Sequence, residues 1–160
     1  MIDHKLLEEL KEYLDLHMHL EVYESSFKYS EPILEECHSF EIDDFINKHK
    51  KPALQELLFQ YIDDRELKDA DVYKKAGMDR KHFSKIRSNP DYKPRKTTII
   101  ALALALELDP DDAEGFLNAA GYSLSGSERY DLAIRFFLER GIYDMQSINE
   151  TLDYLSLKTF

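Results

Sequence analysis

Basic side chains concentrate in one short stretch of an otherwise acidic chain. Residues 74–96 carry nine basic side chains against two acidic ones, a local net charge of +7. Because the whole chain of 160 residues has a formal net charge of −11, the other 137 residues carry −18. Such a stretch is suited to bind a negatively charged surface, while the acidic flanks suppress indiscriminate binding. The alternative is a solvated basic face with no partner.

Groups that could act as nucleophiles, acid–base catalysts or metal ligands do not form a standard pattern. His17 and His19 are separated from Cys37 and His38 by an irregular stretch, so they lack a zinc-site spacing. No carboxylate lies beside a histidine or serine in a pattern that suggests a nucleophile and its base. The chain has only five glycines, and they form no glycine-rich phosphate-binding loop. We therefore expect a protein that is not an enzyme and that binds no cofactor and no metal.

The composition also bears on location. A single cysteine excludes an internal disulfide framework, and the first twenty residues alternate charged and apolar types, unlike a signal peptide. The longest nearly uncharged apolar run, residues 97–106, is about half of what a membrane span requires. We expect a soluble, cytoplasmic protein without a membrane partner.

The first third of the chain predicts short helices joined by a connector. Apolar residues in 2–23 follow the spacing of an amphipathic helix. The pattern then fails over 24–39, which we interpret as a connector with one short helix around 33–37, before another short helix at 40–49. Pro52 is expected in the first turn of a helix that ends near Asp64.

Capping residues predict two short helices in the basic stretch. Asp69 is placed to cap a helix over 70–75, which Gly77 ends. Asp79 is placed to cap a second helix over 80–88, which the following Asn-Pro pair stops.

The run at 97–108 is ambiguous by periodicity. Leucine alternates with alanine in a period of two, as in a strand. Leucine and alanine are, however, the strongest helix formers, and a helix that is apolar on every side is typical of a buried central helix. The run is therefore predicted to be a buried helix.

Three more helices are expected after this run. Asp109, followed by proline, opens an acidic helix that Gly121 ends. Either Ser125 or Ser127 can cap the next helix, which is strongly apolar and stops at Gly141.

A last helix at about 145–155 completes a C-terminal helical hairpin, roughly residues 127–155. Its apolar residues exceed one helix face, so we expect the hairpin to pack on the core or to form a dimer seam. No β-hairpin signal occurs anywhere, so the sequence predicts an all-α protein.

Residues 67–108 read LKDADVYKKAGMDRKHFSKIRSNPDYKPRKTTIIALALALEL. A short helix, a turn with glycine, a capped helix, a basic loop with proline and an apolar helix follow one another. This order resembles the lambda-repressor-like (Xre/Cro-type) helix-turn-helix fold, in which two short helices cross steeply and one remains exposed for the major groove. The positions that match its buried points and its turn are Val72, Ala76, Gly77, Phe83 and Ile86.

The whole chain is also similar to a group of small uncharacterised proteins common in Gram-positive bacteria. They share the stretch resembling VYKKAGMDRKHFSKIRSNPDYKPRK, the Leu/Ala helix and the GYSLS segment. In related proteins the same module is appended to other domains. This resemblance implies a bacterial protein, and it admits an interaction role as well as a regulatory one.

The resemblance to the helix-turn-helix fold also implies which side chains read DNA. The base-reading positions of the recognition helix fall on Arg80, Lys81, Ser84 and Lys85. Arg80 and Lys81 suit guanine O6 and N7, and Ser84 suits a base or a phosphate. Lys85 or Arg87 is expected to reach the backbone.

The predicted contact set continues into the basic loop, with Lys93, Arg95 and Lys96. The start of the first helix departs from the family pattern, because Asp69 and Asp71 stand where a neutral donor normally lies on a phosphate. A carboxylate there would be repelled by DNA. Either the docking geometry differs, or the module does not bind DNA in the usual way.

Together these observations predict three segments: a helical arm and connector at 1–51, a lambda-repressor-like core at 52–121, and the C-terminal hairpin at 122–160. The leading function is transcriptional regulation by binding double-stranded DNA, with a homodimer expected because one recognition helix reads few base pairs. The alternative is an adaptor or antitoxin-like module whose basic face binds an acidic protein partner.

Overall fold

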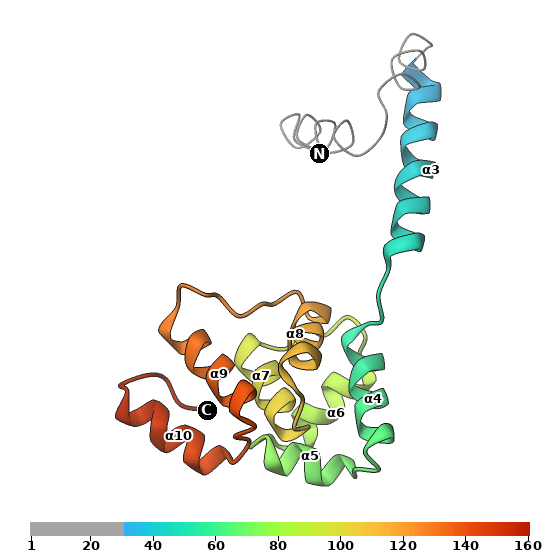
Figure 1. Ribbon diagram of the computed structural model, residues 1–160. Helices are drawn as coiled ribbons and strands as arrows, with labels where there is room; N and C mark the ends of the chain where they lie inside the picture. Colours follow the sequence, from blue (N-terminus) through green and yellow to red (C-terminus); the bar gives the residue numbers. More distant parts are fainter. Residues whose placement is uncertain (1–30) are drawn as a thin grey trace. The chain divides into compact units, whose positions relative to one another are not determined.

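The computed structural model describes residues 31–160, and every regular element in that range is an α-helix (Figure 1). The expected all-α class is therefore confirmed for the described residues, whereas the helix expected at 2–23 lies outside them. The chain divides between Lys50 and Lys51 into two units. No helix in the described range is both long enough and apolar enough to span a bilayer.

Helix α3 (Glu31–His49) is the described helix of the first unit. It is one continuous helix, so the connector expected up to residue 39 and the two separate short helices were wrong. The proline at the second position of α3 does not interrupt the helix, because the backbone N–H groups of the first turn have no intrahelical hydrogen-bond partner. Side-chain pairs four residues apart support the last turns, with Lys48 bonded to Asp44 at 2.6 Å.

Helix α4 (Leu54–Asp64) opens the second unit. Its N-cap is Ala53 in extended conformation, so Pro52 lies just before the helix and not in its first turn as expected. The predicted end near Asp64 is confirmed. Leucines and an isoleucine at intervals of four residues form its buried side: Leu54, Leu58 and Ile62.

Helix α5 (Asp69–Lys75) begins one residue earlier than predicted. Lys68 is its N-cap, and the Asp69 side chain makes no capping bond, so the expected cap at Asp69 was wrong. The reason is local: Lys68 has extended backbone, and Asp69 is already helical. Gly77 then takes a φ of +69°, a left-handed conformation that suits glycine and ends the helix.

Helix α6 (Arg80–Ser88) has the predicted boundaries. The Asp79 carboxylate accepts a hydrogen bond of 2.7 Å from the His82 backbone N–H, which confirms Asp79 as the N-cap. Asn89 ends the helix with extended backbone before the proline. The Gln55 side-chain amide of α4 donates to the backbone carbonyl of Ile86, the last buried residue of α6, at 2.6 Å.

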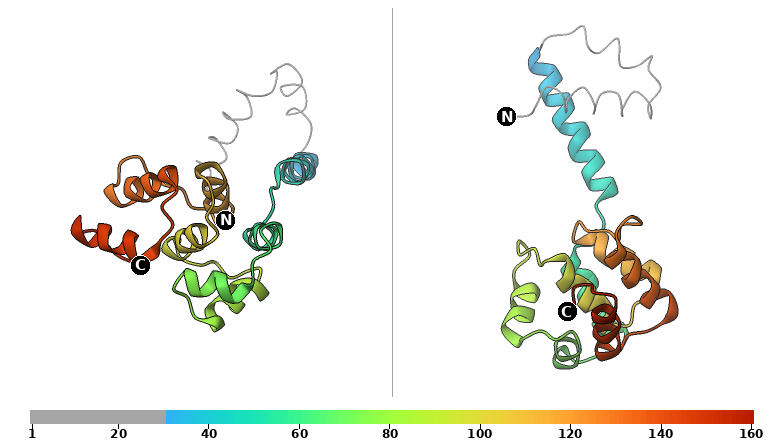
Figure 2. Two further views of the ribbon diagram at one scale, coloured as in Figure 1. Left: turned by 60° about the horizontal axis from the view of Figure 1, so that its bottom comes forward. Right: turned by 90° about the vertical axis from the view of Figure 1, so that its left-hand side faces the viewer.

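Helix α7 (Lys96–Ala105) contains the Leu/Ala run and confirms the prediction that the run is a helix. Every residue from Ile99 to Leu106 is buried. The helix ends before Leu108, because Glu107 has a φ of +53°. α7 packs against α5 and α8, and it lies between α5–α6 and α8 in both figures of the fold (Figures 1 and 2).

Helix α8 (Pro110–Ala119) matches the predicted acidic helix. Asp109 caps it by accepting from the Asp112 N–H at 2.8 Å. Gly121 follows with a φ of +78°. α8 packs against α4 on one side and α9 on the other, so it joins the N-terminal and C-terminal helices of this unit.

Helices α9 (Arg129–Arg140) and α10 (Met145–Tyr154) form the predicted C-terminal hairpin. The N-cap of α9 is Glu128 without a side-chain bond, so the expected serine cap was wrong, whereas the predicted stop at Gly141 is confirmed. The hairpin lies on the side of the unit away from α4 (Figure 1). Its inner side belongs to the same hydrophobic core as α7, through Ile134, Phe137, Leu138, Ile148 and Leu152.

Replacing Leu104 with alanine should lower the free energy of unfolding by about 2–5 kcal/mol, because the side chain is fully buried and a cavity would remain. Urea denaturation followed by circular dichroism measures this change. Tyr154→Ala is the control, since Tyr154 is 88% exposed and its truncation should change stability by no more than about 0.5 kcal/mol. Equal effects of the two substitutions would contradict the central position of α7.

Candidate nucleic-acid interface

The outward side of α6 carries four of the predicted contact residues. Arg80, Lys81, Ser84 and Lys85 are all exposed. Arg80 and Ser84 are four residues apart, as are Lys81 and Lys85, so each pair lies one above the other on the helix. Phe83 and Ile86 of the same helix are buried, which fixes this side toward solvent.

An aromatic ring supports Lys85. Its Nζ lies 4.4 Å from the ring centroid of Tyr92, in the loop that follows α6. The Tyr92 hydroxyl lies 3.1 Å from Nε2 of His82. The ring face attracts a cation without neutralising it, so this contact positions the Lys85 charge and preserves it.

A second tyrosine supports the basic loop. Nζ of Lys93 lies 5.2 Å from the ring centroid of Tyr122, and the Tyr122 hydroxyl donates to the backbone carbonyl of Pro94 at 2.8 Å. Arg95, the next basic residue, is exposed and forms the extended N-cap position of α7. The loop is thereby held against the segment that follows α8.

Arg87 differs from these residues because a carboxylate engages it. Its guanidinium forms an ion pair with Asp69 of α5, and it lies 4.6 Å from the ring centroid of Phe59 on α4. This geometry bears directly on the acidic start of α5. The Asp69 charge is compensated within the protein, by a side chain that the sequence analysis assigned to phosphate.

Lys96 is also engaged. Its Nζ lies 2.6 Å from Asp131 of α9, whose carboxylate is nearly inaccessible to solvent and accepts a second bond of 2.7 Å from the Ser125 N–H. A buried carboxylate requires such partners, because leaving it unpaired costs several kcal/mol. Lys96 therefore joins the basic loop to α9. Burial, followed by the neighbouring Asp131 charge, raises the pKa of Tyr130 to about 12.

The predicted set thus separates into two groups. Arg80, Lys81, Ser84, Lys85, Lys93 and Arg95 lie exposed around α6 and its loop, and Arg87 and Lys96 form internal ion pairs. Sequence reasoning missed the two tyrosines and Asp131. Two features of the sequence could have indicated them. One tyrosine lies within the basic loop and another follows α8, and a single acidic residue stands among the apolar positions of α9.

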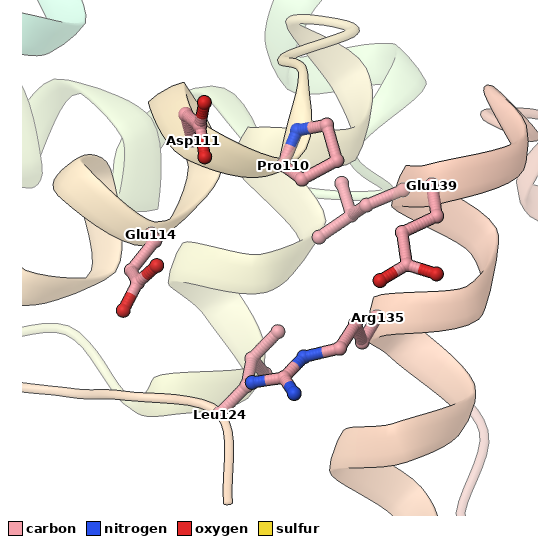
Figure 3. Close-up of a pocket in the computed structure, with 7 residues that line it drawn as sticks. Pro110, Asp111, Glu114, Leu124, Arg135 and Glu139 are labelled. Atoms are coloured by element: carbon pink, nitrogen blue, oxygen red, sulfur yellow. The ribbon is translucent and has the colours of Figure 1, made fainter. Parts of the chain in front are cut away.

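A separate pocket of about 330 Å³ lies between α8 and α9 (Figure 3). It is lined by Arg135 together with three carboxylates, those of Asp111, Glu114 and Glu139. Three carboxylates against one guanidinium make the lining acidic, so the pocket does not suit an anion, and none of the lining residues belongs to the basic set. Across residues 38–160, whose side chains are described, no cluster of metal-ligating groups occurs.

Asp131→Ala should destabilise the protein by about 3 kcal/mol, near the lower end for a broken buried ion pair, because Lys96 retains 30% exposure. Thermal and urea denaturation measure the loss. Asp153→Ala, at an exposed position of α10, is the matched control and should be nearly neutral. A loss below about 1 kcal/mol at Asp131 would show that the pair does not hold the loop.

Comparisons with known proteins found no family model, no curated protein and no solved structure that matches this chain.

Proposed function

We propose that this protein binds double-stranded DNA through a basic surface formed by α6 and the following loop. The surface consists of the cations Arg80, Lys81, Lys85, Lys93 and Arg95. The observation that carries the proposal is that these cations are exposed and that, across residues 38–160, none forms an ion pair with a carboxylate. In a protein of net charge −11, such a set of clustered cations without ion pairs favours an anionic partner over a merely solvated face.

The arrangement of α5, α6 and α7 supports DNA over other polyanions. Two short helices are joined by a tight turn at Gly77, and both rest on a fully buried third helix. In a helix-turn-helix module the second helix enters the major groove with its N-terminal residues toward the base edges. Arg80 and Lys81 occupy the first turn of α6, so they are placed for this role.

The remaining cations suit the DNA backbone. Lys85 lies one turn farther along α6, and Lys93 and Arg95 follow in the loop. The tyrosines under Lys85 and Lys93 limit the freedom of these side chains, which lowers the entropy lost when a phosphate is bound. Arg80 and Lys81 then supply base contacts, and Ser84, one turn beyond Arg80, donates to a base or a phosphate.

The ion pair of Arg87 with Asp69 weakens one objection to this function, whereas Asp71, also near the start of α5, is exposed and forms no ion pair within residues 38–160. In the usual docking pose the start of the first helix lies against the backbone, where a bare carboxylate would be repelled. Here Arg87 compensates the Asp69 charge in place. Such a module contacts one half-site, so regulation of transcription would require two copies of the chain.

Lys85→Ala should weaken binding to all duplexes by a similar factor and reduce the slope of log affinity against log salt by about one. Fluorescence anisotropy with a random-sequence duplex, titrated from low to high salt, measures both quantities. Lys158→Ala is the control, because Lys158 is exposed and lies outside the basic surface. If folded wild-type protein binds no duplex even at low salt, the proposal fails and an acidic protein partner becomes the better explanation.

Arg80→Ala should have a different effect, since a bidentate contact to guanine discriminates between bases. On a site selected from a random pool, the loss should be about 1–3 kcal/mol, with relaxed preference at one base pair. Repeating the selection with the variant protein tests this. An unchanged preference together with a reduced salt slope would assign Arg80 to phosphate instead.

A further inference from the structure

Helix α3 exposes an apolar stripe along its C-terminal half. Ile42, Phe45 and Ile46 are 47%, 51% and 50% exposed. Spacings of three and four residues place them on one side of the helix. His49 extends this side by one turn, with its ring stacked on that of Phe45 at 4.0 Å between centroids. Apolar side chains that cluster in this way, unlike single exposed ones, mark a surface to which another element binds.

The charged residues of the same turns lie away from this stripe. At about 100° per residue, Asp43 and Asp44 fall outside it, as does Lys48. Glu41 falls at its border. Phe40 lies on the opposite side of the helix from Ile42, because two residues correspond to about 200°. The stripe is therefore an apolar surface with charge only beside it.

We infer that this stripe binds the N-terminal segment of the same chain, residues 2–23, which lies outside the described residues, and that the two form a helical hairpin. The sequence of this segment predicts an amphipathic helix whose apolar stripe contains Leu7, Leu10 and Leu14. A helix over 2–23 would be about 33 Å long, against about 28 Å for the 19 residues of α3. Each helix therefore has the length and the apolar side that the other needs.

The position of the connector brings the two stripes to the same level. In a hairpin with a connector at 24–30, residues equally distant from residue 27 lie side by side. The leucines at 7, 10 and 14 then fall opposite positions 47, 44 and 40. The stripe residues of α3 at 49, 46 and 42 are each two positions farther on, or about 3 Å along the axis. The two stripes thus share one spacing, and the connector places them at matching heights.

Tethering is the reason to choose this segment over a second copy of the chain. A short flexible connector gives the segment an effective concentration of about 1 mM at the stripe, far above that of a second copy in dilute solution. The net charge of −11 adds repulsion between copies. This inference concerns the first unit alone and does not rest on the proposed function.

Cysteine cross-linking of the full chain tests the hairpin. With Cys37→Ser, no native thiol remains, and the pair Leu14→Cys with Ile42→Cys should form an intramolecular disulfide at a rate independent of protein concentration. The matched control pairs Leu14→Cys with Phe40→Cys, because Phe40 is 74% exposed on the opposite side of α3. The control should cross-link about tenfold more slowly, since cysteines that point apart cannot be bridged without backbone movement.

Non-reducing electrophoresis and mass spectrometry distinguish the outcomes. Cross-linked dimers formed by Ile42→Cys alone, in the same Cys37→Ser chain, would assign the stripe to a second copy and overturn the inference. Equal rates of intramolecular cross-linking in the pair and its control would overturn it as well.

Hydrogen exchange gives a second readout that requires no thiol. Leu14→Lys should speed the exchange of α3 backbone amides about tenfold, because a helix that loses its cover opens more often. Leu16→Lys is the matched control, since Leu16 lies about 160° around the predicted helix from Leu14, and it should leave the exchange unchanged. Exchange in α3 that Leu14→Lys does not alter would contradict the docking of the segment.

Discussion

The burial of α7 is the constraint on which the rest of this unit depends. A helix that is apolar on every side has no polar side that can face water, so other elements must cover all of its sides. α5 and α8 pack directly on it. The other helices of the unit extend this cover with their buried sides. The short α5 and α6 gain their stability from this contact more than from their own length, because isolated helices of two turns do not persist in water.

Cations in the basic stretch are held in two physically different ways. Carboxylates engage some of them: Arg87 is paired with Asp69, and Lys96 with Asp131. These pairs join elements to one another, and in each of them a carboxylate of the protein compensates the cation. Tyrosine rings support others, such as Lys85, and a ring face positions a cation without cancelling its charge. The same stretch of sequence therefore supplies both the ion pairs that join helices and the exposed cations on which the proposed binding depends.

Local chemistry in the sequence determined the all-α class and much of the helix register. The cap at Asp79 and the stop at Gly141 each depend on residues within one turn, so they can be read without knowledge of the fold. The Leu/Ala run was predictable as a helix because intrinsic propensity outweighed its period of two. The exposed positions Arg80 and Lys81 follow from the same local register, since Asp79 fixes where α6 begins.

Only the tertiary structure decided which charges remain free. Asp69 caps nothing and instead meets Arg87, and Lys96 reaches Asp131, a residue 35 positions away. Residues close together in the sequence cannot predict such pairs, because the pairs form only when packing on α7 brings distant helices together. Such packing can also bury a carboxylate, which then requires a partner. Sequence alone determined where positive charge is concentrated. Tertiary packing determined which of those charges are paired with a carboxylate of the protein and which are not.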